Sequence, residues 1–240
     1  MTATATDFRA IFDPTGRQTA RRLGCPVCGG TVTAGDCIDD RYGYGIQVRE
    51  CYGCSLRYIM PRMIAIDYAD LYASGAYRRL VSAYHGREMG GCEVDYALSV
   101  VHFLQGPRLA WERILDIGGA PQGIAVKWGL DADVIDPAID GQTAETFDPA
   151  GRQWDLITVC QTVDHLLEPG AVFKKLAGCL ALDGILFFDA VDFDATKEYK
   201  IDHPCNFNAR SATMLAHVAG LRIDKMERSG NHLRYLCRHW

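Results

Sequence analysis

The chain has 240 residues, of which 48% are hydrophobic and 23% charged, and its formal net charge is −5. These values are typical of a soluble globular protein with one large domain and a small additional module. An acidic chain repels phosphate backbones, so nucleic acid is not an expected partner. No apolar run approaches the ~18 residues of a membrane helix, and no apolar signal segment follows Met1. We therefore expect a cytoplasmic protein without a membrane partner; the sequence indicates no oligomeric state.

In a reducing compartment, the ten cysteines are expected to be free thiols or metal ligands. Four of them form two pairs with two residues inside each pair and twenty-two between the pairs, namely Cys25, Cys28, Cys51 and Cys54. A two-residue gap lets both thiolates of a pair reach one tetrahedral metal ion. The stretches 31–33 and 47–50 between the pairs resemble short strands, so residues 1–62 are predicted to form a small zinc ribbon. Because four thiolates leave no open coordination position, this zinc ion is expected to be structural.

The segment 63–108 is predicted to be a helical linker or lid. Its tyrosines include a pair at helical spacing, and Gly75 interrupts the pattern, which indicates a helical hairpin. A further helix is expected over 92–106. A tyrosine ring can pack on the next domain while its hydroxyl reaches a ligand, so both roles stay open for this hairpin. Tyr77, close to Gly75, is the first candidate for a ligand contact.

The stretch that tells most about residues 109–240 is a glycine-rich turn. An apolar strand runs into Gly118 and Gly119, and a helix follows. Glycines let the backbone approach a ligand closely, and a helix N-terminus favours a phosphate or a carboxylate. The next strand ends in Asp136, twenty residues after Asp116. An acid at this distance often accepts hydrogen bonds from ribose hydroxyls, so the pattern predicts a nucleoside pocket.

The remaining residues alternate between strands and helices: a strand over 154–160, a helix over 173–182, a strand over 185–189, a helix over 211–219, and a hairpin of 221–227 with 232–237. The acid before the glycines, the acid-proline pair after the second strand and the DGILFF stretch resemble class I S-adenosylmethionine-dependent methyltransferases. With the cysteine pairs, the chain looks most like small-molecule and sugar methyltransferases that carry an N-terminal zinc-binding domain. This resemblance implies an α/β, Rossmann-like core of seven strands behind the zinc ribbon, with the hairpin as strands six and seven.

The resemblance also implies S-adenosylmethionine as the cofactor. Asp116 would anchor its methionine amino group, and Asp136 would hold its ribose hydroxyls. The other expected contacts are two glycines along methionine and ribose, two residues beside adenine and one at the end of strand four: Gly118 and Gly119, Glu145 and Thr146, and Gln161.

Methyl transfer to oxygen or carbon usually needs a general base, and histidine suits this role near neutral pH. His165 follows the fourth strand and His203 follows the fifth, so both are expected at the same edge of the sheet. Each could take the acceptor proton or serve the structure only; we favour His203 on position alone. Asp164 could orient His165, although neighbouring side chains often point apart. The expected acceptor is a small molecule, such as a sugar or a natural-product intermediate.

Two other functions stay open. An RNA methyltransferase could grip RNA with basic and aromatic side chains of the ribbon: Tyr42, Tyr44, Arg49, Arg57 and Tyr58. The acidic balance opposes this function. A cofactor-binding scaffold without activity is the second alternative, because a fold does not establish a function. A dehydrogenase is disfavoured by the acid before the glycines.

Overall fold

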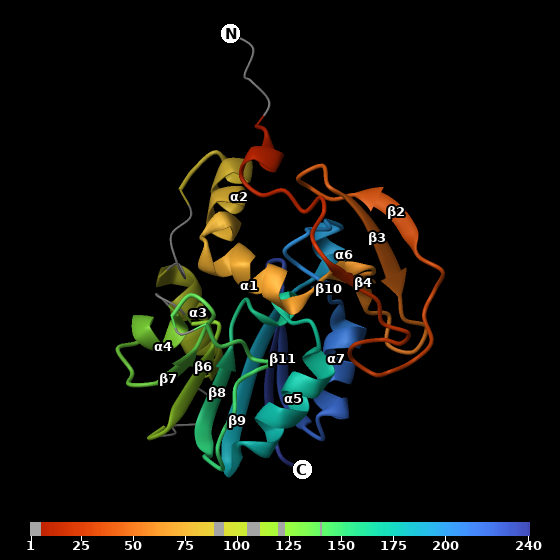
Figure 1. Cartoon of the computed structure of the whole chain (residues 1–240). Coiled ribbons are helices and arrows are strands. Elements are labelled where there is room, and N and C mark those ends of the chain that lie inside the picture. Colours follow the sequence, from red (N-terminus) through yellow and green to blue (C-terminus); the bar gives the residue numbers. More distant parts are fainter. Residues whose placement is uncertain (1–5, 89–93, 105–110, 120–122, 140) are drawn as a thin grey trace.

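The structure, a computed structural model, describes residues 6–88, 94–104, 111–119, 123–139 and 141–240. Its largest part is a sheet of six strands with helices on both faces (Figure 1). The strands are β6 (Ile114–Ile117), β7 (Asp133–Ile135), β8 (Trp154–Val159), β9 (Leu180–Val191), β11 (Arg222–Ser229) and β12 (His232–Arg238). Their order across the sheet is β11-β12-β9-β8-β6-β7. The four strands from β7 to β9 run parallel, and β12 and β11 complete the sheet as an antiparallel hairpin.

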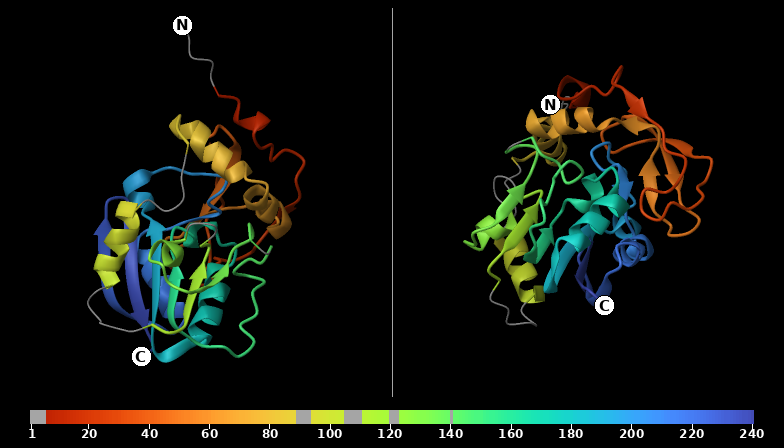
Figure 2. Two further views of the ribbon diagram at one scale, coloured as in Figure 1. Left: turned by 90° about the vertical axis from the view of Figure 1, so that its left-hand side faces the viewer. Right: turned by 60° about the horizontal axis from the view of Figure 1, so that its bottom comes forward.

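Apolar side chains on both faces of the sheet hold the helices in place. One face packs against α5 (Pro169–Gly178) and α7 (Ala209–Val218), and this core includes Phe173, Leu215 and Phe188. The other face packs against α3 (Val94–Leu104) and α4 (Ile124–Lys127), with Phe103 and Phe187 in its core. Figure 2 shows these helices from two further sides. Parallel strands that are covered on both faces consist of nearly continuous apolar residues. This pattern is why the strands in this half of the sequence could be predicted.

The prediction of seven strands was wrong for the described residues, in which the sheet has six. The chain between β7 and β8, in its described parts 136–139 and 141–153, forms turns and irregular structure and no strand. This segment is rich in Asp, Gly, Pro and Thr and lacks the alternation of β-branched and polar residues that stabilises a strand. The expected terminal hairpin is present as β11 and β12.

Element boundaries also differ from the prediction around the fifth strand. The helix expected over 173–182 begins earlier, at Pro169, because proline is favoured in the first turn of a helix. It ends at Gly178. The strand expected over 185–189 is longer and starts at Leu180, so Asp183 and Gly184 continue it instead of forming a turn.

The N-terminal residues form a second, four-stranded sheet with the order β10-β4-β3-β2. Its strands are β2 (Asp36–Asp39), β3 (Gly45–Glu50), β4 (Arg57–Ile59) and β10 (Cys205–Asn206). The expected strand 31–33 is reduced to one isolated bridge between Val32 and Cys51. A two-stranded sheet of β1 (Thr19–Ala20) and β5 (Arg62–Met63) lies at the start and end of this region.

The N-terminal sheet is not a separate globule. Its strand β10 comes from the C-terminal half of the chain and pairs with β4. The buried side chains of Cys25, Val27 and Tyr58 belong to the same apolar cluster as β6, β8 and α5. The boundary proposed at 62/63 therefore follows the sequence pattern, while the apolar packing is continuous across it. The boundary proposed at 108/109 lies outside the described residues.

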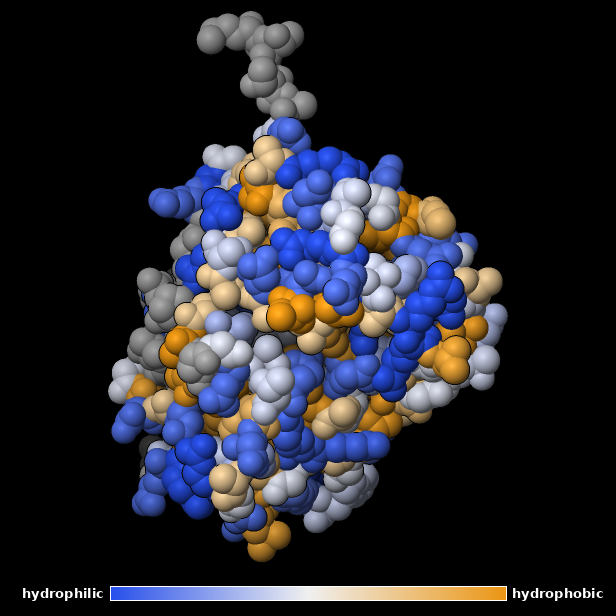
Figure 3. All heavy atoms as spheres, viewed as in Figure 1, coloured by the Kyte–Doolittle hydropathy of each residue, from blue (hydrophilic) through white to orange (hydrophobic). Residues whose placement is uncertain are grey.

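The expected helical hairpin consists of α1 (Ala65–Ala73) and α2 (Ala76–His85), which meet at Gly75. Gly75 has a φ of +70°, a conformation that only glycine adopts without cost, so it permits the sharp reversal. Both helices lie above the large sheet (Figure 1). On the face shown in Figure 3, hydrophobic residues are scattered among hydrophilic ones. No helix within the described ranges is long and apolar enough to cross a membrane.

Candidate functional site

A cavity of about 540 Å³ lies between the large sheet and the helical hairpin. Its floor is formed by the residues that follow β6, β7 and β8, and its roof by α1 and α2. Ligands of open α/β sheets bind at the carboxyl ends of the strands, where the loops diverge. Most of the residues that the sequence analysis singled out line this cavity: Tyr77, Asp116, Gly118, Gly119, Asp136, Glu145, Gln161 and His165.

The glycine turn lies at one end of the cavity and has no room for side chains. Gly118 has a φ of +79°, and a Cβ on it would overlap the hydroxyl of Thr162. A Cβ on Gly119 would overlap the carboxylate of Asp116. Asp116 is 1% exposed and accepts a hydrogen bond of 2.7 Å from the Thr158 hydroxyl. The turn thus presents backbone and a fixed carboxylate to the cavity; residues 120–122 lie outside the described ranges.

The next strand brings a second carboxylate to the same end. Asp136 follows β7, lines the cavity and accepts a hydrogen bond of 2.8 Å from the backbone of Ala138. Glu145 also lines the cavity and accepts a hydrogen bond of 2.8 Å from the backbone of Leu167. Thr146 does not line the cavity and bonds to Thr143 within its own turn. Of the two residues that were predicted beside adenine, Glu145 therefore lines the cavity and Thr146 does not.

Gln161 follows β8 and lines the floor of the cavity. It is a non-glycine residue with a φ of +50°, a strained conformation that costs on the order of 1–3 kcal/mol. Its backbone N–H donates a hydrogen bond of 2.6 Å to the buried carboxylate of Asp189, which holds the loop in this conformation. Such strain is concentrated at functional sites, where it positions groups for a ligand.

His165 is the histidine of the prediction that reaches the cavity. Its Nδ1 lies 2.7 Å from the carbonyl oxygen of Asp202 and 2.8 Å from the Tyr72 hydroxyl. A carbonyl oxygen only accepts, so Nδ1 carries the proton and the lone pair is on Nε2. Burial lowers the pKa of His165, which keeps the ring neutral at pH 7. A neutral imidazole with an oriented lone pair can accept a proton.

His203 lies behind His165 and not at the cavity wall. The two rings meet edge to face. His203 is 7% exposed, and its Nε2 is 3.4 Å from the carboxylate of Asp202. Burial, and then the charge of Lys200, lowers the pKa of His203 well below its usual range. His203, which we favoured as the base from the sequence, therefore contacts His165 and does not line the cavity.

Asp164 does not orient its neighbour His165. Its carboxylate is buried and accepts a hydrogen bond of 3.0 Å from the backbone of Val191. Burial raises the pKa of Asp164 to about 7. The orienting group for His165 is instead the carbonyl of Asp202, a backbone atom that no side-chain pattern in the sequence could reveal.

The roof of the cavity is aromatic. Tyr72 and Tyr77 contact the ring of His165 edge to face, with centroid distances of 5.4 Å and 5.3 Å. Burial raises the pKa of both tyrosines, so both keep their protons at neutral pH. Tyr77 was predicted; Tyr72 was not, although its helical spacing from Tyr68 was a signal. Tyr96 and His232 also line the cavity and were missed, because they come from α3 and β12.

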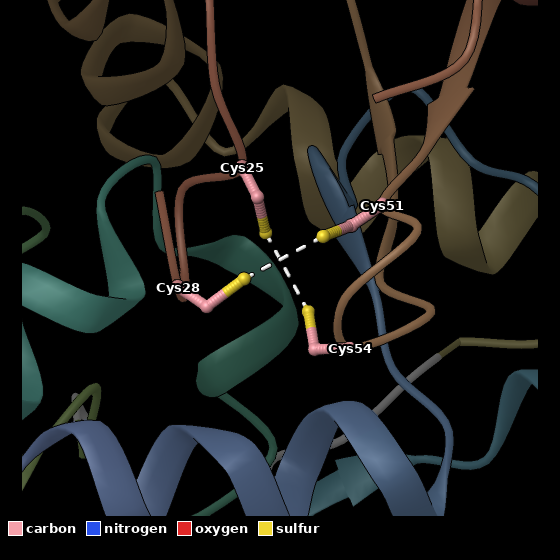
Figure 4. Close-up of side chains that lie close together, drawn as sticks. All are labelled: Cys25, Cys28, Cys51 and Cys54. Carbon is pink, nitrogen blue, oxygen red and sulfur yellow. Dashed lines mark hydrogen bonds between the residues drawn. The ribbon is translucent and has the colours of Figure 1, made fainter. Parts of the chain in front are cut away.

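The four cysteines of the two pairs converge on one point (Figure 4). The Sγ atoms of Cys25 and Cys54 are 3.6 Å apart, and those of Cys28 and Cys51 are 3.5 Å apart. A tetrahedral zinc ion with Zn–S bonds of about 2.3 Å separates its sulfur atoms by roughly 3.8 Å, so the arrangement fits such an ion. Donation from the Cys54 thiol lowers the pKa of Cys25 and raises that of Cys54 itself, and burial raises the pKa of Cys28.

Comparisons with known proteins agree with this fold. A methyltransferase from Leishmania major described as S-adenosylmethionine-dependent is 18% identical, with a TM-score of 0.53 over 66% of this chain and 77% of that chain. The plantazolicin methyltransferase BpumL, solved with S-adenosylhomocysteine and a substrate analogue, has a TM-score of 0.54 at 12% identity, over 72% and 94%. A methyltransferase from Clostridium acetobutylicum has a TM-score of 0.51 at 11% identity, over 69% and 97%. No protein-family model matches the sequence, and neither does any curated protein.

The chain therefore has the fold of class I S-adenosylmethionine-dependent methyltransferases. In this chain, the fold has the strand order β11-β12-β9-β8-β6-β7 and a cavity at the carboxyl ends of the parallel strands. At these identities the likeness defines the architecture, and the chemistry has to be argued from the residues of the site.

Proposed function

We propose that the protein transfers a methyl group from S-adenosylmethionine to a small-molecule acceptor, at oxygen or carbon. The observation that carries this proposal is one cavity with two different ends. Asp116, Gly119 and Asp136 form an end suited to a nucleoside and an amino acid, and His165 provides a proton acceptor in the same cavity.

The cofactor end offers partners for the amino group and the ribose of S-adenosylmethionine. Asp116 would anchor the amino group, and the side-chain-free surface of Gly118 and Gly119 would accommodate the methionine and ribose portion. Asp136, which accepts a hydrogen bond from the backbone of Ala138, would hold the ribose hydroxyls. Glu145 would lie beside adenine. When bound, the cofactor supplies a methyl group on a positively charged sulfur.

His165 takes the proton at the acceptor end. As the acceptor oxygen or carbon forms its bond to the methyl carbon, the electrons of the carbon–sulfur bond return to sulfur. The acceptor proton passes to Nε2 of His165, while Nδ1–H remains bonded to Asp202. His203 and Tyr72 hold the ring of His165 from behind and from the roof. We assign the base to His165 because its side chain lines the cavity and that of His203 does not. His203 contacts the ring of His165 and has the role of a positioning residue.

The cysteine cluster is proposed to hold a structural zinc ion. All four possible protein ligands are cysteines, and Cys25, Cys51 and Cys54 are buried in the main apolar cluster. A closed site of this kind stabilises a fold and performs no chemistry. We retain the division into a zinc-binding region 1–62, a helical lid 63–108 and a methyltransferase region 109–240 as a functional description.

The burial of three tyrosines weighs against RNA as the substrate. Tyr42, Tyr44 and Tyr58 were candidates for stacking on bases, but they are 6%, 1% and 0% exposed. Arg57 is engaged by Glu50 and Asp194. Single-stranded RNA is bound by exposed aromatic faces and free basic groups, and Tyr42, Tyr44, Tyr58 and Arg57 offer neither.

The proposal is tested by calorimetric titration of S-adenosylhomocysteine into the purified, zinc-loaded protein. We expect micromolar binding that Asp136→Ala weakens by roughly 10- to 100-fold, since charged hydrogen bonds contribute about 1.5–3 kcal/mol. Asp148→Ala is the matched control, because Asp148 is exposed and lies outside the cavity. Absence of binding by the folded protein would contradict the proposal and favour a scaffold or another nucleotide.

The role of His165 is tested once an acceptor has been found by screening with radiolabelled S-adenosylmethionine. His165→Gln should bind S-adenosylhomocysteine normally and lose turnover by about 10²- to 10⁴-fold, the usual contribution of a general base. Full turnover of this variant would remove His165 from the mechanism.

A further inference from the structure

A second histidine lines the cavity and has no role in the mechanism above. His232 is the first residue of β12 and pairs with Val191 at the end of β9. β12 is separated from β6 by β9 and β8, so its end lies three strand spacings, roughly 14 Å, from the glycine turn. His232 therefore borders the part of the cavity that is left for the acceptor.

His232 faces a buried carboxylate that is already held in place. Asp189 is 0% exposed and lies on β9. One of its oxygens accepts the backbone N–H of Gln161 at 2.6 Å, and the other accepts a short hydrogen bond from the Tyr96 hydroxyl. Nδ1 of His232 lies 3.4 Å from the oxygen that Tyr96 contacts. The position of Asp189 is thus fixed by two donors, and a third group approaches it.

Nδ1 of His232 is buried and has no hydrogen-bond partner. An unpaired buried polar atom is unfavourable, and a small rotation of the ring would bring Nδ1–H into a bond with Asp189. Histidine–carboxylate bonds at active sites are often long before the ligand binds and shorten in the complex. With Nδ1–H donated to Asp189, the lone pair of Nε2 is the remaining polar feature of the ring.

We propose that His232, oriented by Asp189, binds the methyl acceptor by accepting a hydrogen bond on Nε2 from a second O–H or N–H group. This inference rests on the proposed function and assigns a substrate class to it. When oxygen is methylated, the acceptor has two polar hydrogens, one that leaves to His165 and one that His232 holds. Compounds with a single such group leave the lone pair of His232 unpaired when they enter the cavity, and a site built for a hydroxyl strongly rejects the analogue that lacks it.

The first test needs no acceptor. ¹⁵N NMR of the imidazole groups is recorded on the zinc-loaded protein saturated with S-adenosylhomocysteine, and the His232 signals are assigned by their loss in His232→Gln. We expect the neutral ring of His232 to carry its proton on Nδ1. Asp189→Asn should mix the two tautomers, whereas Asp183→Asn, an exposed position on the same strand, should not. A proton on Nε2 in the wild-type protein would overturn the proposal, even if Asp189→Asn does not fold.

The second test is kinetic and uses acceptors in matched pairs, each a compound with two O–H or N–H groups and its analogue with one. We expect kcat/KM to favour the first member at least tenfold. His232→Phe should remove this preference by raising KM for the acceptor, and His232→Gln, which keeps an acceptor atom, should restore part of it. KM for S-adenosylmethionine should not change. Equal use of both members, or a preference that survives His232→Phe, would overturn the proposal.

The two proposals can fail separately. If S-adenosylhomocysteine does not bind, the methyltransferase function fails while the tautomer of His232 can still be measured on the ligand-free protein. If the cofactor binds and acceptors are methylated without regard to their second polar hydrogen, only the role of His232 fails.

Discussion

The imidazole rings of His165 and His203 meet edge to face with their centroids 4.5 Å apart. Burial lowers the pKa of both rings, and their mutual proximity opposes a charge on either. The unfolded chain binds protons on these histidines near pH 6.5, and the folded protein does not. Folding stability is therefore complete above this pH and declines as the pH falls.

This relationship predicts that His203→Gln makes the protein less sensitive to acid. The free energy of unfolding of the wild-type protein should fall by about 1 kcal/mol more than that of the variant between pH 7 and pH 5.5, the share of one histidine that stays neutral when folded. Urea denaturation at both pH values measures the difference. Acid release of a metal affects both proteins alike and cancels. Equal pH dependence in the two proteins would show that His203 can be protonated in the folded state.

The close contact between Gly119 and Asp116 gives a second prediction. Gly119→Ala places a methyl group on the Asp116 carboxylate and should weaken binding of S-adenosylhomocysteine by at least about tenfold, because one charged contact is displaced. The measurement is calorimetry. Gly178→Ala is the control, since a Cβ there at the end of α5 meets nothing within 4 Å. Unchanged affinity in Gly119→Ala would place the methionine portion elsewhere.

Removal of one zinc ligand is predicted to lower stability. Cys54→Ser should lose the single bound zinc ion, and its Tm should fall by roughly 10 °C or more, because structural zinc contributes several kcal/mol and each kcal/mol corresponds to about 2–4 °C at this size. Cys37→Ser should change neither, as Cys37 is exposed on β2 and outside the cluster. Elemental analysis and thermal denaturation provide the readouts. A metal-free wild-type protein that is equally stable would refute a structural zinc site.

A partly buried ion pair next to the cavity residue Leu167 gives a fourth prediction. Arg62 donates to the carbonyl of Leu167 and, at 2.6 Å, to the Glu168 carboxylate. The Arg62 side chain is 6% exposed and that of Glu168 is 33% exposed, so Arg62→Met should destabilise the protein by about 2 kcal/mol, less than the ~3–5 kcal/mol for breaking a fully buried pair. Arg152→Met, which breaks an exposed pair with Asp133, should cost less than about 1 kcal/mol. Urea denaturation of both variants makes the comparison, and similar costs would mean that Glu168 is well compensated by Arg22.

Local sequence was enough to bring together the residues of the proposed cofactor end in one cavity. Asp116, Gly118 and Gly119 follow one strand, Asp136 follows the next, and the carboxyl ends of neighbouring parallel strands must meet. The two cysteine pairs were equally predictable, because ligand spacing is a property of the chain itself.

The acceptor end could not be predicted in the same way. Asp189 and His232 lie close together because of the register between the antiparallel strands β9 and β12. Tyr96, which contacts Asp189, comes from helix α3 on one face of the sheet. Such contacts depend on tertiary packing, which no local pattern encodes. The lack of a strand in the described residues between β7 and β8 was missed for a different reason, since the family resemblance implied an element that the residues there do not favour.

The pairing of β10 with β4 has a consequence for biosynthesis. On a ribosome, the cysteine pairs emerge about 150 residues before Cys205 and Asn206, the segment that completes their sheet. The early chain holds all four cysteines but keeps an open edge on β4 until residues 205–206 have been translated. Unpaired edges of this kind invite association with other chains. Production of the protein should therefore depend on chaperone supply and on the speed of translation between β5 and β10.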